Sequence, residues 1–185
     1  MVEPIDAASA ESVGWCVLGV DPGSRVTGWG VLSWRGEALQ SVSGAIAMAR
    51  SLETPQRLQT IFRGLVEVID AHQPDVVAVE RPFHNQYARS AMVLGQAQAA
   101  ALLAAAERHV PVVEYAPREV KQAVSGDGNA EKEAVAEALR LQLGTSVVAE
   151  TMDASDALAV AYCHAVLTRR GTVEAGGFSG VMGSR

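Results

Sequence analysis

The stretch VLGVDPGSRVTGWGVL, residues 17–32, places a carboxylate where a buried strand should end. The apolar, β-branched run that leads into Asp21 is typical of a strand in the middle of a sheet. The Pro-Gly pair that follows is typical of a tight turn, and a second apolar run begins after it. The stretch therefore predicts a β-hairpin whose first strand ends in an acidic side chain, a position that needs a chemical reason.

Five strands are expected from this point outward, at residues 15–20, 27–34, 40–48, 75–80 and 111–116. The first three are joined by short connections that contain glycine, which predicts an antiparallel meander. The fourth, DVVAVE, is short and apolar almost throughout, as expected for a strand that is buried on both faces.

Helices are expected at residues 54–73, 88–109, 117–124, 130–143 and 153–169. In the first of them apolar residues recur with helical spacing, Thr54 is placed to cap the helix, and Pro55 suits its first position. Strands joined by helical crossovers imply parallel neighbours and right-handed connections. The expected fold class is α/β, with a five-stranded mixed sheet flanked by helices on both faces.

The composition fits one folded domain between two tails. The chain has 185 residues, and 49% of them are hydrophobic, which is enough for a full core. We expect a flexible N-terminal tail at 1–14, a domain at 15–170 and a flexible C-terminal tail at 171–185. No apolar run is long enough to cross a membrane and no signal peptide is visible, so we expect a cytoplasmic protein with reduced, buried Cys16 and Cys163.

Four carboxylates fall where the expected fold brings them together. Asp21 and Glu80 each end an apolar strand, and they lie side by side if the two strands are parallel neighbours. Asp153 and Asp156 are three residues apart, so they share one face in the first turn of the last helix, where the helix dipole favours negative charge. That helix can bring both acids over the edge where the strands end.

Such a cluster predicts a metal site. Carboxylates packed together repel one another and are costly to bury, and Mg²⁺ or Mn²⁺ removes this cost because hard cations prefer oxygen ligands. Two ions about 3.5–4 Å apart form a site for in-line phosphoryl transfer. Taken singly, Asp21 could simply form a turn, Glu80 could pair with Arg81, and Asp153 or Asp156 could cap the helix. All four together favour the metal site.

The net charge of −6 does not decide the partner. Taken alone, it argues mildly against nucleic acid. Several of the acids lie in the N-terminal tail, however, and carboxylates that hold divalent metals are not free to repel phosphate. The net charge therefore does not exclude a nucleic-acid partner.

Five segments of the chain resemble one known family. They are VLGVDPGSRVTGWGVL, VVAVERPF, LGQAQA, PVVEYAPREVKQAVSGDGNAEKEAV and DASDALAVAYCHA, in this order. Between about residues 17 and 167 the chain resembles RuvC, the family of bacterial Holliday-junction resolvases. The resemblance implies an RNase H-like fold and a homodimer that acts with the RuvA–RuvB branch-migration machinery. It also implies paired symmetric nicks in four-way DNA junctions, made with two Mg²⁺ or Mn²⁺ ions per active site, in recombination and DNA repair.

The resemblance assigns roles by position. The catalytic, metal-binding carboxylates would be Asp21, Glu80, Asp153 and Asp156. Phe83 matches the aromatic residue that the family inserts near the crossover, and Lys121 and Lys132 match basic residues near the scissile phosphate. These two are the only lysines of the chain, and an ammonium group is a compact charge suited to phosphate. On spacing alone, Lys132 could equally lie on a solvated helix face and Phe83 could be a core aromatic.

Further candidates for contact with the DNA backbone are Arg25, Arg81, Arg89 and Arg118. His164, two turns beyond Asp156 in the last helix, is interpreted as structural. The helix at 88–109 is apolar around much of its circumference, and we expect its part around residues 92–96 to join a dimer interface.

Three other classes share some of these features. Actin-like sugar kinases and chaperone ATPases also open with a G.D.G motif, but they need two such domains and this chain is too short for them. YqgF-type nucleases share that motif and lack the VKQ…AEK block. A non-catalytic junction-binding protein would have no need of four intact carboxylates.

Overall fold

A computed structural model of the chain describes residues 14–35, 38–82, 88–144, 149 and 151–168, except for the side chains of residues 35, 88 and 89. Its strands are β1 (Trp15–Asp21), β2 (Val26–Arg35), β3 (Ala38–Ala47), β4 (Val76–Glu80) and β5 (Val112–Tyr115). They form one sheet in the order β3-β2-β1-β4-β5, in which β1, β2 and β3 are antiparallel and β1, β4 and β5 are parallel. The expected meander and mixed sheet are confirmed.

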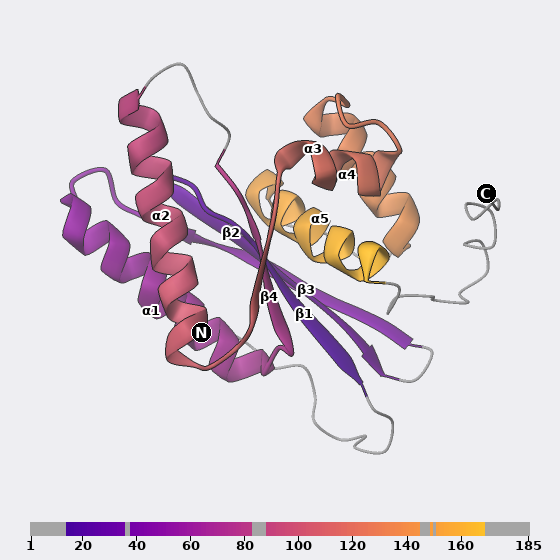
Figure 1. Ribbon diagram of the computed structural model, residues 1–185, viewed down its shortest axis with the longest axis horizontal. Helices are drawn as coiled ribbons and strands as arrows, with labels where there is room; N and C mark the ends of the chain where they lie inside the picture. The colour runs from indigo at the N-terminus through magenta and orange to yellow at the C-terminus, as the bar shows by residue number, and fades with distance from the viewer. Residues whose placement is uncertain (1–13, 36–37, 83–87, 145–148, 150, 169–185) are drawn as a thin grey trace.

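The helices are α1 (Thr54–His72), α2 (Ala88–Glu107), α3 (Pro117–Ser125), α4 (Lys132–Leu143) and α5 (Met152–Leu167). Helices α1 and α2 cover one face of the sheet, while α3, α4 and α5 lie on the other (Figure 1). The fold therefore has three layers, as expected for strands joined by helical crossovers. None of the described helices is long and apolar enough to cross a membrane.

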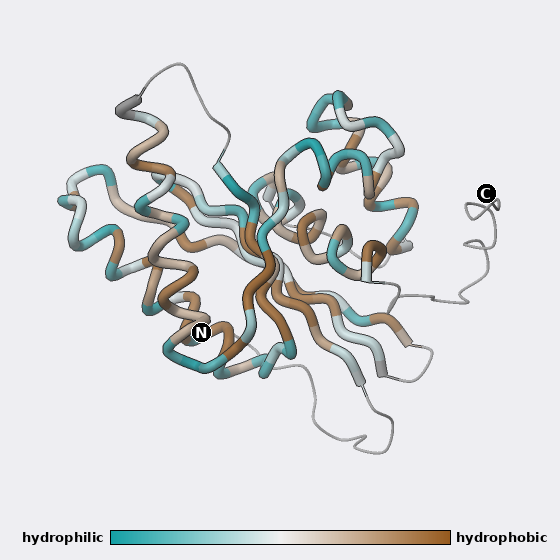
Figure 2. Tube along the Cα trace, viewed as in Figure 1, coloured by the Kyte–Doolittle hydropathy of each residue, from teal (hydrophilic) through white to brown (hydrophobic). Residues whose placement is uncertain are grey.

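Each face of the sheet has its own hydrophobic core, because successive side chains of a strand point to opposite faces. In β1, Leu18 and Val20 pack toward α1 and α2, whereas Val17 packs toward α5. Strand β4 is buried over Val76–Val79, as predicted from its continuous apolar run. Figure 2 shows this pattern as brown strands at the centre of the molecule with more hydrophilic segments around them.

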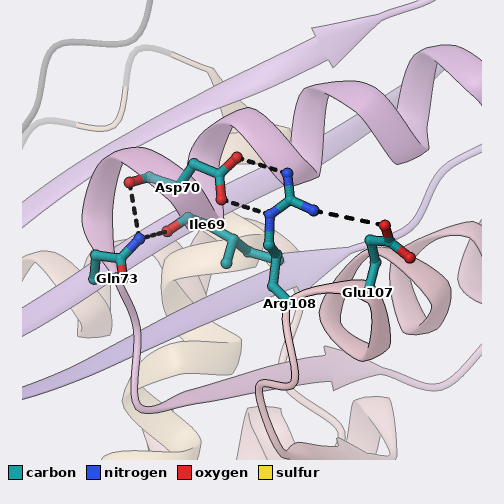
Figure 3. Close-up of polar contacts among 5 residues, drawn as sticks. All are labelled: Ile69, Asp70, Gln73, Glu107 and Arg108. Atoms are coloured by element: carbon teal, nitrogen blue, oxygen red, sulfur yellow. Dashed lines mark hydrogen bonds and ion pairs between the residues drawn. The ribbon is translucent and has the colours of Figure 1, made fainter.

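Helices α1 and α2 are tied together at their C-terminal ends. The Arg108 guanidinium donates to both carboxylate oxygens of Asp70, at 2.6 and 2.8 Å, and also lies 3.9 Å from Glu107 (Figure 3). Next to this pair, Gln73 ends α1 in the left-handed conformation, and its side chain donates to the carbonyl oxygen of Asp70 at 3.0 Å. These contacts of Arg108 and Gln73 lie at the C-terminal end of α1.

Helix α5 packs directly on the backbone of β1 and β2, because the strands present glycines to it. A Cβ atom on Gly19 would lie 2.6 Å from the Ala161 nitrogen, and one on Gly28 would lie 2.6 Å from the Asp153 carbonyl carbon. A Cβ on Gly30 would meet the Leu158 side chain at 2.7 Å. Only hydrogen fits at these three positions, so the glycines set how closely α5 approaches the sheet.

Two helix caps differ from the prediction. Glu53, not Thr54, is the N-cap of α1, and its N–H donates to the Gln56 side chain at 3.0 Å. Thr151 caps α5, and its hydroxyl accepts from the Ala154 N–H at 3.2 Å, so neither acid of that first turn is the cap. In both cases the capping residue lies outside the apolar pattern from which the helix was predicted, and such patterns leave the first residue undetermined.

Other predictions remain open or need refinement. The two predicted tails lie almost wholly outside the described residues, so they and the domain bounds at 15–170 stay predictions. Cys163 is buried as expected, whereas Cys16 is only half-buried; neither is in a disulfide. His164 is 6% exposed, and its Nδ1 lies 2.7 Å from the Tyr115 hydroxyl, which fits the structural role expected for it.

Candidate metal centre

The parallel pairing of β1 and β4 brings two of the predicted acids to one edge of the sheet. Val20 is in register with Val79, and Asp21 and Glu80 are the next residues of the two strands. Both side chains are half-buried, since apolar strand residues precede them and the edge opens above them. A rigid sheet thus holds two carboxylates at neighbouring positions, as the sequence predicted.

The first turn of α5 lies over the same edge. Gly28 is the cross-strand partner of Asp21, and it is also the residue on which the Asp153 carbonyl group rests. Asp156 follows one turn later and is near enough to raise the pKa of both Asp21 and Glu80. The fold therefore brings all four predicted carboxylates to one end of the β1–β4 pair.

The electrostatics of this edge are those of an uncompensated acidic cluster. The pKa of Asp21 is raised to about 6, mainly by burial and also by the negative charges of Asp156 and Asp153, against the opposing effect of Lys132. The pKa of Glu80 is raised to about 8, mainly by burial and also by the charges of Asp21 and Asp156, against the opposing effects of Lys132 and Lys121. Without a cation, Glu80 therefore retains its proton at neutral pH, whereas Asp21 is protonated mainly below about pH 6.

Lys132 supplies the one direct positive contact to the cluster among the described ion pairs. Its ammonium nitrogen lies 2.6 Å from Asp156 Oδ2, and this contact raises the pKa of the lysine. Lys132 is the first residue of α4, and the loop before it is fixed by Gln122, whose side chain donates to the Gly126 carbonyl at 2.7 Å and accepts from the Gly128 N–H at 3.2 Å. The contact with Asp156 was not predicted.

The donor set fits a hard divalent cation in its chemistry. All four acids offer oxygen ligands only, and a bound cation would offset the burial and mutual repulsion that raise the pKa values of Asp21 and Glu80. Within the described ranges, no group of three or more Asp, Glu, His or Cys side chains is yet arranged to hold an ion. Asp156 is engaged by Lys132 instead, so binding of a metal requires these side chains to rearrange.

The other predicted residues differ in how the structure places them relative to the four acids. Lys121, on α3, is half-buried and close enough to lower the pKa of Glu80. Arg25 and Arg118 are exposed, and Arg81 forms an exposed ion pair with Glu119 at 3.2 Å. Phe83 lies outside the described residues, as does the side chain of Arg89, so their roles stay predictions.

A further arginine at this edge was not predicted. The Met48 N–H donates to the Arg25 carbonyl at 2.9 Å, which joins the β1–β2 turn to the loop that carries Arg50. Arg57 supports this loop through hydrogen bonds to the carbonyl oxygens of Leu52 and Arg50, at 3.0 and 3.3 Å. The position of Arg50 could have been predicted from the sequence. In an antiparallel meander the third strand runs in the same direction as the first, so both strands end at the same edge of the sheet.

The described arginines differ in whether a carboxylate contacts them. Arg108 and Arg140 each contact a carboxylate at 2.6–2.7 Å, and Arg81 contacts Glu119 at 3.2 Å. Arg25, Arg50 and Arg118, around the edge, take part in no ion pair among the described side chains. These three arginines are therefore available for anions, although the net charge of the chain is negative.

Comparisons with known proteins agree on the class and the family. Residues 17–164 match the family described as crossover junction endodeoxyribonuclease RuvC. The protein of that name from Dehalococcoides mccartyi is 46% identical over 149 residues, which cover 80% of this chain and 89% of the relative. The protein of that name from Pelobacter propionicus is 50% identical over 149 residues, which cover 80% of this chain and 84% of the relative.

Among solved structures, T. thermophilus RuvC in complex with a Holliday junction substrate aligns with a TM-score of 0.77 at 35% identity, covering 85% of this chain and 97% of that one. The yeast mitochondrial Holliday junction resolvase aligns with a TM-score of 0.56 at 13% identity over 80% of this chain and 76% of that one, which shows a shared fold alone. The fold class is RNase H-like α/β, as predicted. Within that class, the chain belongs to the RuvC family.

Proposed function

We propose that this chain is a metal-dependent endodeoxyribonuclease that resolves four-way DNA junctions by paired symmetric nicks, in recombination and repair. One observation carries the proposal: in a member of the RuvC family, Asp21, Glu80, Asp153 and Asp156 come together at one edge of the sheet. The relative from T. thermophilus, whose solved complex contains a Holliday junction, supports this choice of substrate.

The four carboxylates would hold Mg²⁺ or Mn²⁺, two ions per active site. When bound, such ions lower the pKa of the attacking water and neutralise charge that develops on the phosphate. Asp21 and Glu80 contribute ligands from a rigid sheet, while the first turn of α5 contributes Asp153 and Asp156. Burial and repulsion from neighbouring acids disfavour the charged forms of Asp21 and Glu80, and a bound cation would offset both effects.

The basic residues around the edge would bind the DNA backbone. Lys121 and Lys132 lie next to the acids and suit the scissile phosphate, as point charges do. The exposed arginines at this edge, Arg25, Arg50, Arg81 and Arg118, would contact flanking phosphates. The same role is kept for Arg89 from the sequence alone. Phe83 would stack near the crossover, as the family resemblance implies.

The decisive experiment is cleavage of a labelled four-way junction by the purified chain. We expect paired nicks in symmetry-related strands when Mg²⁺ or Mn²⁺ is present, and no cleavage in EDTA. A linear duplex of the same sequence is the matched control for junction selectivity. Failure to cut the junction with either metal, by protein that binds it, would contradict the proposal.

We also propose a dimer, because paired nicks require two active sites related by a two-fold axis. Met92, in the N-terminal part of α2, is 61% exposed, so its apolar side chain is accessible to a second copy of the chain. We expect Met92→Asp to shift the light-scattering mass at micromolar concentration toward that of one 19.4 kDa chain.

Leu103 is the matched control for this change. It lies near the other end of α2 and is 62% exposed, so Leu103→Asp introduces the same charge on the same helix. The dimer should survive Leu103→Asp. A parent protein that is already monomeric, or equal effects of both substitutions, would count against an interface at residues 92–96. By family resemblance we further propose that the protein acts with the RuvA–RuvB complex in the bacterial cytoplasm.

The raised pKa values predict an unusual dependence of stability on pH in the metal-free protein. The carboxyl groups of Asp21 and Glu80 have pKa values of about 6 and about 8, against 3.8 and 4.5 when unperturbed. Between about pH 4 and pH 8 the folded state therefore binds more protons than the unfolded state, so the free energy of unfolding falls as the pH rises. Urea unfolding in EDTA at pH 5 and at pH 8 should show this loss.

Glu80→Gln tests the origin of the effect, because it removes the group with the larger shift in pKa. The pH dependence should become weaker in this variant. Saturating Mg²⁺ should restore stability at pH 8, since metal binding replaces the protons. Stability in EDTA that is flat or rises between pH 5 and pH 8 would be inconsistent with these carboxyl groups being protonated.

A further inference from the structure

We infer that Lys132 is the internal counter-ion of the acidic centre in the metal-free protein, and that a metal ion must displace its ammonium group from Asp156. The inference rests on the proposed function in one respect: it takes the four carboxylates to be the metal site. It adds an exchange within the protein that controls when the site can bind metal and when the lysine can bind phosphate.

The contact has the geometry of a strong charge-assisted hydrogen bond. Lys132 Nζ lies 2.6 Å from Asp156 Oδ2, and the Asp156 side chain is 17% exposed, so the carboxylate is largely shielded from water. The Lys132 side chain is 65% exposed, so the lysine reaches the cluster from solvent. Because its long side chain is exposed along much of its length, the lysine can also move away from Asp156 into solvent.

The starting point of that side chain is fixed. Lys132 is the first residue of α4, and the buried side chains of Val135 and Leu139 anchor this helix in the core beside α5. The preceding loop is held by the two hydrogen bonds of Gln122. The position of the lysine relative to Asp156 is thus set by the packing of two helices, and only the side chain has to move when the contact breaks.

The charge balance of the site makes the contact competitive with a metal. Among the ion pairs of the described residues, Lys132 with Asp156 is the only one that involves any of the four acids. The described side chains also include no group of three or more that is arranged to hold an ion. Because the ammonium group occupies an oxygen that the site needs, binding of a divalent cation has to compete with the lysine.

The exchange couples two events. An ammonium group released from Asp156 stays within reach of the same edge, where a phosphate is expected, because the lysine stem is anchored there. The lysine then becomes available to the DNA only when the metal is bound. Metal binding therefore has two effects: Asp156 becomes a ligand of the ion, and the Lys132 ammonium group becomes free to bind the phosphate.

The test compares Mn²⁺ affinity, measured by calorimetry without DNA, in the parent and in two methionine variants. Lys132→Met keeps the apolar stem and removes the charge, and we expect Mn²⁺ to bind about tenfold more tightly, the effect of one partly buried charged hydrogen bond. Lys121→Met is the matched control. It removes the charge of the other lysine near Glu80, and Lys121 forms no ion pair with any of the four acids among the described contacts. We expect a change of less than about threefold there, from long-range charge alone.

Two further measurements make the result specific. In EDTA, Lys132→Met should melt at a lower temperature than the parent, because the carboxylates lose their counter-ion, and Lys132→Arg should restore much of the melting temperature. Equal Mn²⁺ affinity in the two methionine variants, or weaker binding in Lys132→Met, would overturn the inference. If Mn²⁺ binds more tightly to Lys132→Met but the parent cuts no junction, the proposed function fails and the counter-ion role stands.

Discussion

Asp21→Asn is expected to lower the rate of junction cleavage by orders of magnitude while leaving the protein folded. The amide keeps the size of the side chain and one ligand oxygen, but it is a poorer ligand for a hard cation than a carboxylate. Asp21 ends a central strand, so no other acid can take its position without moving the sheet. Single-turnover cleavage of a labelled junction in saturating Mg²⁺ measures the effect.

The same substitution should leave binding and stability intact, which separates chemistry from folding. Without metal, the variant lacks one buried charge that repels Asp156 and Glu80, so its melting temperature in EDTA should equal or exceed that of the parent. Junction affinity in Ca²⁺ or EDTA should be no weaker, because it depends on basic side chains. Glu67→Gln, an exposed acid on α1, is the control and should cut normally. An Asp21→Asn variant that cuts at close to the parental rate would show that Asp21 is not a metal ligand.

Gly28→Ala is expected to cost about 3 kcal/mol of stability, near the upper end for overpacking, and to abolish cleavage in the protein that still folds. A Cβ atom on Gly28 would lie 2.6 Å from the Asp153 carbonyl carbon, which is backbone and cannot rotate away. The first turn of α5 must therefore move off the sheet and carry its two acids away from Asp21. Urea unfolding and single-turnover cleavage at a permissive temperature measure the two effects.

Gly64→Ala provides the matched control in the same protein. Its Cβ would also make a close contact, at 2.7 Å, but with Cδ1 of Ile46, the far end of a flexible side chain. Alanine is also favoured over glycine inside a helix by about 0.5–1 kcal/mol, so this variant should stay within about 1 kcal/mol of the parent and cut normally. If the two variants were equally stable and active, the close approach of α5 would not position the acids.

The elements that could be predicted from the sequence were those with a strong local pattern. Apolar runs indicated that β1 and β4 are buried strands, and helical crossovers implied parallel neighbours in the sheet. That β1 and β4 pair with each other was only a condition in the sequence argument, and their observed pairing places Asp21 beside Glu80. The expectation that α5 lies over the same edge needed only the acids of its first turn.

The remaining features depend on how helices pack, which no local pattern encodes. Gly19 and Gly28 occur inside strands, where glycine is usually unfavourable, but their role becomes visible only when α5 is placed on them. The contact of Lys132 with Asp156 depends in the same way on the angle between α4 and α5. From the sequence, Lys132 was assigned to phosphate because it matches a basic residue of the RuvC family, and the glutamates beside it gave no sign of the contact with Asp156.

The dependence of the centre on α5 also has a consequence for biosynthesis. Asp21 belongs to the first strand, whereas Asp153 and Asp156 belong to the last described helix, so ligands from the two ends of the sequence must meet. On a ribosome the strands and first two helices emerge long before α5, and the apolar face that α5 later covers stays open until then. A nascent or truncated chain that lacks α5 is therefore both prone to aggregate and unable to cut DNA, which delays nuclease activity until the domain has been completed.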